Sequence, residues 1–227
     1  MEHPGNVEKS FRRGAVVDWG SQEVLNDFLY DWLAYPVGGQ VQLNFFTTPQ
    51  GQGASIWDAN QTKTYEDTNM EVGSQMARGE AFLVQHVALR FWQATLPIQQ
   101  LNGAAVTANQ VIAANDAYLF WSHGFVEFKV VNKVQLRQGP LSSFPPPTRL
   151  NLDAAAAAES TVASTTNQVI GSHLSPVGPL YTIASPGITL EYGMKFSFTL
   201  NWSIAQAIVT AGRVQAMLIG KRMRVGQ

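Results

Sequence analysis

The chain has 227 residues and a formal net charge of −1, so it has no overall attraction to nucleic acid or anionic lipid. It contains no cysteine, which excludes a disulfide framework and thiolate chemistry. The N-terminus has no apolar h-region and no segment has 18 uninterrupted apolar residues, so we expect neither a signal peptide nor a membrane span. Only 14% of the residues are charged, against about 25% in a typical protein, which favours a subunit that buries its outside against copies of itself over a monomer with an uncharged polar surface.

Turn signals divide the first half of the chain into an arm, two strands and a long loop. Residues 1–35 are predicted to be an N-terminal arm that ends in a short helix over 21–35, although the aromatic residues there also permit a strand. Apolar and polar residues alternate over 41–45, which is typical of a strand. Residues 49–79 are polar and predict an exposed loop, and a second strand begins at residue 80.

The second half of the chain contains short strands and Ala-rich segments. Apolar residues alternate with polar ones over 125–136, which predicts a strand; a short strand is expected at 180–183 and the last strand at 214–225. The Ala-rich segment 104–115 favours a short helix. In 153–159 an aspartate precedes five alanines, so we expect a second, exposed helix there.

Residues 187–202 give the clearest pattern in the chain. Every even position from Ile188 to Trp202 is apolar or aromatic, and the odd positions carry Thr, Glu, Gly, Lys, Ser and Asn. This predicts one strand, or two strands joined by a bend near Gly193, with one face on a core. Together with the Gly- and Pro-rich turns, it predicts an all-β fold: a single jelly-roll β-sandwich of the eight-stranded type over residues 36–227, with one or two short helical insertions.

The histidines do not form a recognisable catalytic or metal-binding pattern. His3, His86, His123 and His173 are far apart, and none lies in an H-x-H or H-E-x-x-H motif. The pairs Ser122-His123 and Ser172-His173 lack a nucleophile-elbow context. We therefore expect neither an enzyme nor a cofactor; a cupin-like metalloenzyme is the weakest alternative.

The long loop concentrates four carboxylates. Asp58, Glu66, Asp67 and Glu71 are the residue types that bind Ca²⁺, but their spacing matches no known calcium loop. Solvated loop charge is the favoured interpretation, with a weak calcium cluster as the alternative.

Two tryptophans and two arginines are candidate interface residues. Trp57 and Trp121 suit a sugar-binding face, although tryptophan in a β-sandwich more often lies in a core or an interface. Arg12 and Arg13 belong to a basic cluster that is too short to form a nucleic-acid-binding arm.

Three sequence blocks carry a family resemblance. They are, in order, Leu29–Asp31 with Gln40–Phe46 and Pro49–Gln52; Asp67–Met70 with Gly79–Gln85; and Gly124–Val130 with Pro140-Leu141 and Phe144-Pro145. In their order and spacing, these blocks resemble the jelly-roll major capsid proteins of tailless icosahedral bacteriophages, of the lipid-containing or small single-stranded-DNA types. The chain is short for a double jelly roll, so the resemblance implies a single one.

The resemblance implies a structural coat subunit of a virion, made in the host cytoplasm. Its expected partners are copies of itself in trimeric or hexameric capsomers, other capsid proteins and, in some relatives, an internal lipid membrane; sequence-specific nucleic acid is not expected. The loop 49–79 and the insertion 151–170 would then form inter-subunit contacts or outward decorations. A carbohydrate-binding jelly-roll spike or receptor-binding module is the main alternative.

Overall fold

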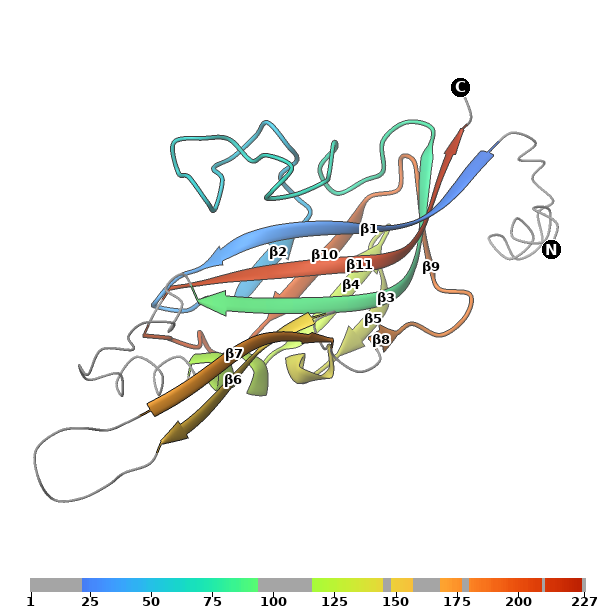
Figure 1. Cartoon of the computed structure of the whole chain (residues 1–227). Helices are drawn as coiled ribbons and strands as arrows, with labels where there is room; N and C mark the ends of the chain where they lie inside the picture. The colour runs from blue at the N-terminus through green and yellow to red at the C-terminus, as the bar shows by residue number, and fades with distance from the viewer. Residues whose placement is uncertain are drawn as a thin grey trace, which may run out of the picture.

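The computed structural model describes residues 22–93, 116–144, 148–156, 168–176, 180–209 and 211–225. These residues form a mostly β structure with two antiparallel sheets, arranged as a β-sandwich, and a separate two-stranded hairpin (Figure 1). The described strands are β1 (Gln22–Tyr35), β2 (Gln42–Phe45), β3 (Glu80–Gln93), β4 (Phe125–Val130), β5 (Lys133–Gln138), β6 (Thr148–Ala156), β7 (Gln168–Pro176), β8 (Tyr181–Thr182), β9 (Ile188–Glu191), β10 (Phe196–Asn201) and β11 (Gly212–Val225). A 3₁₀ turn covers Leu141–Ser143, and residues 116–122 are helical.

The larger sheet has the strand order β1-β11-β3, with β8 and β9 both paired to the far edge of β3. β1 and β11 pair over all 14 residues of each strand. A bulge interrupts the pairing of β11 with β3 between Ile219 and Gly220. A Cβ atom at Gly220 would lie 1.8 Å from the Leu83 carbonyl oxygen, so the close approach at the bulge requires glycine.

The smaller sheet has the strand order β2-β10-β4-β5. The single strand predicted over 125–136 is wrong: Val131 and Asn132 have φ angles of 48° and 63° and form the two-residue turn of a hairpin between β4 and β5. A bulge in β5 then places Leu136 opposite Phe128. Because of this bulge, Leu136 points into the core as the even-numbered residues of β4 do. The apolar alternation of the sequence therefore looks continuous across the turn.

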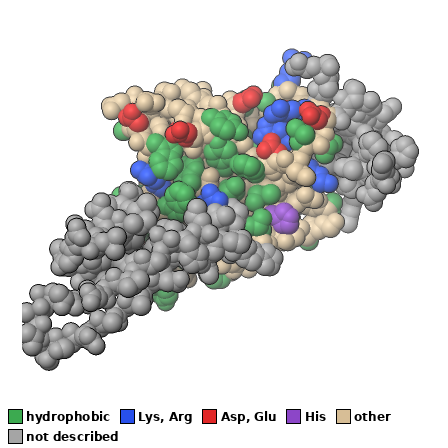
Figure 2. Space-filling model, viewed as in Figure 1, with side chains coloured by type: hydrophobic (Ala, Val, Ile, Leu, Met, Phe, Trp, Pro, Cys, Tyr) green, Lys and Arg blue, Asp and Glu red, His purple; other side chains and the backbone are tan. Residues whose placement is uncertain are grey.

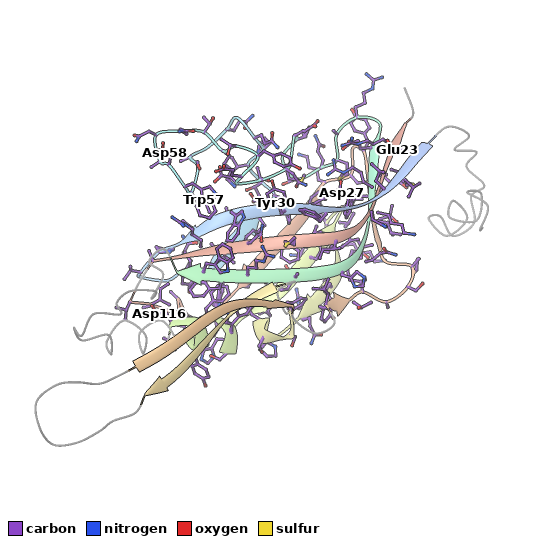
Figure 3. All side chains as sticks on the ribbon, viewed as in Figure 1. Glu23, Asp27, Tyr30, Trp57, Asp58 and Asp116 are labelled. Atoms are coloured by element: carbon purple, nitrogen blue, oxygen red, sulfur yellow. The ribbon has the colours of Figure 1, made fainter. Side chains whose placement is uncertain are left out.

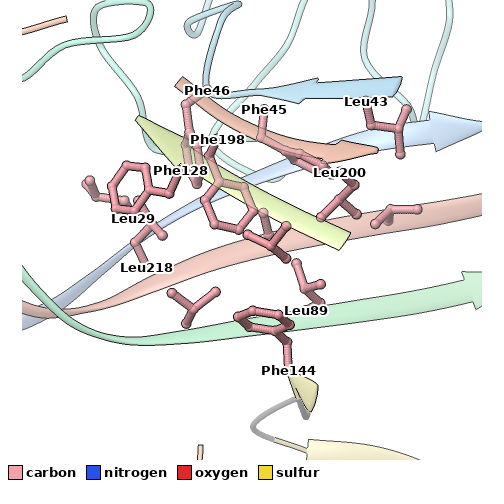
Figure 4. Packing of buried hydrophobic residues seen from close by; sticks show 14 of the residues in the cluster. Leu29, Leu43, Phe45, Phe46, Leu89, Phe128, Phe144, Phe198, Leu200 and Leu218 are labelled. Carbon is pink, nitrogen blue, oxygen red and sulfur yellow. The ribbon is translucent and has the colours of Figure 1, made fainter. Parts of the chain in front are cut away.

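The main core lies between the two sheets and is rich in aromatic rings (Figure 4). Phe198 of β10 is at its centre, fully buried, with ring centroids 5.7 Å from Phe128 and 6.1 Å from both Phe45 and Phe46. These contacts join three neighbouring strands of the smaller sheet, and Leu89 and Leu218 belong to the same cluster from the larger sheet. One continuous core therefore holds the two sheets together.

The alternation predicted over residues 187–202 is confirmed. The segment forms two strands, and the turn between them connects the two sheets. β9 pairs with β3 in the larger sheet, whereas β10 lies between β2 and β4 in the smaller one. Gly193 has a φ of +79° in the turn between them. The even positions of both strands point into the same core, and Tyr192, 58% exposed at the crossing, is the exception.

The helix expected over 21–35 is wrong, and the strand alternative is confirmed. β1 alternates between Leu29 and Leu33, which contact the main core, and Tyr30 and Trp32, which are buried on the opposite face. A strand with two apolar faces lacks the period-2 pattern, so its spacing resembles that of a helix. Residues 22–35 are thus part of the sheet rather than an arm, and residues 1–21 lie outside the described residues.

The exposed helix expected from residue 153 is also wrong. Residues 148–156 form β6, which pairs antiparallel with β7 along its full length. Helix propensity is a weak prior, and the β-branched Val169 and Ile170 on the partner strand favour a hairpin. The helix predicted over 104–115 lies outside the described residues.

Candidate interaction surface

The larger sheet is apolar on its outer face as well as on its core face. Tyr30, Trp32, Ala88 and Met217 form a second buried cluster, on the side of the sheet opposite Leu29 and the main core. Partly buried Ile56, Trp92, Leu180 and Ile219 pack against this cluster. An outer sheet face in a monomer is normally polar, so this face is unusual.

Six aromatic residues extend across this outer face, and we call them the aromatic surface: Phe28, Tyr30, Trp32, Trp57, Tyr65 and Trp92. The Trp32 ring lies 5.6 Å from Trp57 and 5.3 Å from Trp92, and the Tyr30 ring lies 5.8 Å from Phe28 and 5.9 Å from Tyr65. Hydrophobic side chains gather over this sheet in Figure 2. Phe28, Trp57 and Tyr65 are 43%, 38% and 66% exposed, so these three rings remain accessible on the part of the chain that the structure describes.

The loop between β2 and β3 lies along the free edge of β1 and carries Trp57 and Tyr65. The Trp32 amide donates to the Asp67 carbonyl at 2.8 Å, and the Asn69 side chain binds the Tyr30 amide at 2.9 Å and the Phe28 carbonyl at 2.7 Å. These bonds satisfy the edge of β1 at residues 28–32. The loop, drawn above β1 in Figure 3, is therefore a fixed part of the surface.

A buried ion pair attaches the loop to the sandwich. Lys63 Nζ lies 2.6 Å from Asp31 Oδ1 and also donates to the Trp32 carbonyl, and both charged side chains are buried. Asp31 Oδ2 accepts the Phe46 amide at 2.7 Å. Burial raises the pKa of Asp31, while the Lys63 ammonium and these hydrogen bonds oppose the rise.

Asp67 holds the loop in shape from within. Its fully buried carboxylate accepts hydrogen bonds from the Ser55 hydroxyl, from the Ile56 amide and from the Thr64 amide, at 2.9–3.0 Å. Asp58 closes a turn by accepting from the Asn60 amide at 2.9 Å. These carboxylates are occupied by the fold of the loop.

An open hollow of about 310 Å³ lies on the outer side of this loop, between Ser55, Trp57, Asp58, Gln61, Thr64, Tyr65 and Glu66. It combines two exposed aromatic rings with two carboxylates. The Arg213 guanidinium lies 4.3 Å from the centroid of the Trp57 ring, in cation–π contact with it. Carboxylates and aromatic rings in this arrangement can bind a ligand through charge and through contact with the ring faces.

Comparison with protein-family models, with curated proteins and with solved structures finds no match. No helix among the described residues is long and apolar enough to cross a membrane.

Of the predicted interface residues, Trp57 is in the aromatic surface and Trp121 is not. Trp121 is partly buried against the main core, with its ring 5.0 Å from Phe120. Arg12 and Arg13 lie outside the described residues.

The four carboxylates of the loop do not come together as a calcium site. The Asp67 carboxylate is buried and accepts hydrogen bonds from within the loop, whereas Glu66 and Glu71 are exposed. Among the described residues there is no group of three or more His, Asp or Glu side chains that could hold a metal ion. The pattern of acidic residues reflects turn formation and loop charge.

Sequence reasoning missed Tyr30, Trp32, Trp92 and Met217. A signal for them was present: β3 and β11 have apolar residues on both faces, as in a strand that is covered on two sides. That signal indicates a covered outer face without revealing which segment covers it.

We expect Tyr30 to ionise only at strongly alkaline pH. Its hydroxyl donates to the Tyr65 carbonyl, and burial, with the charges of Tyr65, Asp67 and Glu66 nearby, raises its pKa from 10.0 to about 12. Stability from this shift is fully present below pH 10.0 and is lost as the pH rises towards about 12. The difference in ultraviolet titration between the wild type and Tyr30→Phe measures the pKa; a value near 10 would contradict the buried position.

Proposed function

We propose that the chain is a structural coat subunit, built as a single jelly roll, that self-assembles into capsomers of an icosahedral viral capsid. Copies of the chain would be its main partners in the virion, with other capsid proteins and an internal lipid membrane as further contacts. The proposal gives the chain no catalytic role and no sequence-specific contact with nucleic acid.

The strand pairing supports the jelly roll. With the β6–β7 hairpin set aside and β8 and β9 counted as one broken strand, eight strands remain. The first pairs with the eighth (β1–β11), the second with the seventh (β2–β10), the third with the sixth (β3–β9) and the fourth with the fifth (β4–β5). A chain folded in half and rolled into two sheets has this order, which is the double Greek key of jelly rolls.

The observation that carries the functional proposal is the aromatic surface. Jelly rolls serve capsids, lectins and enzymes alike, so the fold alone does not decide the function. Phe28 on the outer sheet face and Trp57 and Tyr65 on the adjoining loop are exposed, which is typical of a protein–protein contact, in which tryptophan, tyrosine and arginine contribute most of the affinity. The low charged share of the chain supports burial of further surface.

The test is the mass of the purified chain as a function of concentration, by size-exclusion chromatography with light scattering. We expect discrete multiples of the 24.8 kDa chain mass that increase with concentration. A Phe28→Ser/Tyr65→Ser double variant, altered only at exposed rings, is expected to shift this equilibrium towards the monomer. A wild-type chain that stays monomeric at high concentration would contradict the proposal.

The hollow beside Trp57 favours a second candidate function, a carbohydrate-binding module. Aromatic rings next to carboxylate and amide groups suit a sugar, because one face of the sugar ring can stack on an aromatic ring while its hydroxyl groups donate hydrogen bonds to the carboxylates and the amide. A glycan screen with the wild type and Trp57→Ala tests this candidate. A glycan that binds the wild type and is lost in the variant would favour this candidate over the coat subunit.

A further inference from the structure

The hollow on the outer loop has the chemistry of a site for a cation. Glu66 contributes an exposed carboxylate, and Trp57 and Tyr65 contribute two aromatic rings. Asp58 adds a second negative charge, although its two oxygens already accept hydrogen bonds from Asn60 and Gln61. Hydrogen bonds, first that from the Asn60 amide, lower the pKa of Asp58, so this side chain stays charged at neutral pH. Acidic groups beside aromatic faces attract guanidinium and ammonium groups.

No basic residue is among the residues that line the hollow. Lys63, the basic residue nearest in sequence, is turned inward and paired with Asp31. Arg213 lies over the Trp57 ring at 4.3 Å without lining the hollow, so one guanidinium of the same chain already contacts this indole. Among the described residues, the hollow therefore offers negative charge beside aromatic rings, and no basic side chain lines it.

The outer face of the smaller sheet is the matching surface. Lys129 and Arg137 project from neighbouring strands β4 and β5, with side chains 38% and 62% exposed. Both contact a single carboxylate, that of Glu127, so this face carries an excess of positive charge. Arg137 donates two of its N–H groups to Glu127 and retains further donors and a planar face.

We propose that the hollow between Trp57, Asp58, Tyr65 and Glu66 receives Arg137 from the outer face of the smaller sheet of a second copy of the chain. This assignment rests on the proposed coat function and names its contact. Because the two surfaces lie on different faces of one subunit, the contact joins unlike surfaces and repeats from copy to copy. Such head-to-tail contacts build closed rings when their rotation closes, which is the geometry that a capsomer requires.

The test is a reciprocal charge reversal in the full chain, with association measured by light scattering. In Glu66→Lys the new lysine would face Arg137 of the neighbouring copy, so two positive charges meet. In Arg137→Glu the new glutamate would face Glu66 of the neighbouring copy, so two negative charges meet. Each variant alone is therefore expected to associate about tenfold or more weakly than the wild type. Mixing the two variants in equal amounts allows opposite charges to pair at the contact and is expected to restore association. The double variant Glu66→Lys/Arg137→Glu is expected to associate by itself for the same reason.

Two controls isolate the contact from general charge and folding effects. Glu71→Lys makes the same change in the same loop outside the hollow, and Lys195→Glu reverses an exposed charge in the turn before β10. Both are expected to associate like the wild type. Arg137→Gln removes the charge without placing a carboxylate beside Glu127, so it keeps the test valid if Arg137→Glu unfolds, and weaker association is again expected.

The outcomes separate this assignment from the coat function. If the wild type assembles and both reversal variants assemble equally well, or if the mixture fails to restore association, the hollow does not receive Arg137 and only the assignment fails. If only Glu66→Lys weakens association, the hollow meets another surface, which also overturns the assignment. If the wild type itself stays monomeric, the coat function fails and the assignment fails with it.

Discussion

Phe198→Ala is expected to lower the free energy of unfolding by about 3–5 kcal/mol, the usual loss for a fully buried phenylalanine. The ring is fully buried and lies 5.7–6.1 Å from Phe128, Phe45 and Phe46. Its removal leaves a cavity between three strands of the smaller sheet, and rigid β-strands cannot move to fill it. Urea unfolding followed by circular dichroism, at concentrations where the chain is monomeric, measures the loss.

Thr199→Ala is the matched control on the opposite face of the same strand. The Thr199 hydroxyl accepts a hydrogen bond from the side-chain amide (Nδ2) of Asn201 at 2.9 Å, and Thr199 is 7% exposed, so its loss is expected to cost about 1 kcal/mol. A loss at Phe198 no larger than that at Thr199 would contradict a core between the two sheets.

Lys63→Met is the second substitution with a large expected effect. It removes the counter-ion of Asp31, which lies fully buried 2.6 Å from Lys63 Nζ, and breaking a buried pair in this way costs about 3–5 kcal/mol. Because the pair attaches the loop to β1, we also expect the loop to become more accessible to proteases. Urea unfolding and limited proteolysis measure the two effects.

The pH dependence of this variant identifies the cause of the loss. Burial already raises the pKa of Asp31 in the wild type against the opposing charge of Lys63, so removing Lys63 is expected to raise this pKa further and favour the neutral carboxyl in the folded chain. Stability is then greatest below the ordinary carboxyl pKa and is lost as the pH rises through the raised one. Asp31→Asn/Lys63→Met should recover part of the loss at neutral pH, and exposed Lys195→Met should change stability by about 0.5 kcal/mol or less. A double variant as unstable as the sum of the single changes would contradict the ion-pair account.

The sequence predicted strands well where one face is buried and the other is polar. Residues 187–202 alternate because the even positions point into the main core from β9 and β10. The pattern depends only on local geometry, so it survives even though the two strands belong to different sheets. It cannot reveal which sheet a strand joins, because strand pairing is set by residues far apart in the sequence.

Prediction failed where a second surface covers the chain. β1 has Leu29 on the core face and Tyr30 on the outer face, so its spacing resembled that of a helix. β6 is rich in alanine, a strong helix former, but pairs with β7. Trp57 could be named as an interface candidate from its residue type, but its place beside Trp32 and Arg213 depends on the course of the loop.

The loop between β2 and β3 links the fold to the proposed function. Asp67 shapes it, and the pair of Asp31 with Lys63 fixes it to β1. Trp57 and Tyr65 are thereby held at the edge of the sheet with little freedom to lose on binding. Aromatic groups that are fixed before binding give more affinity for the same area.

Negative-stain electron microscopy of the purified chain under assembling conditions tests the central claim most directly. We predict uniform closed particles, either ring-shaped capsomers or shells built from them, and their loss in the variant with Phe28→Ser and Tyr65→Ser. A field that shows only monomers, or irregular aggregates that the variant forms equally well, would contradict a coat subunit that assembles through the aromatic surface.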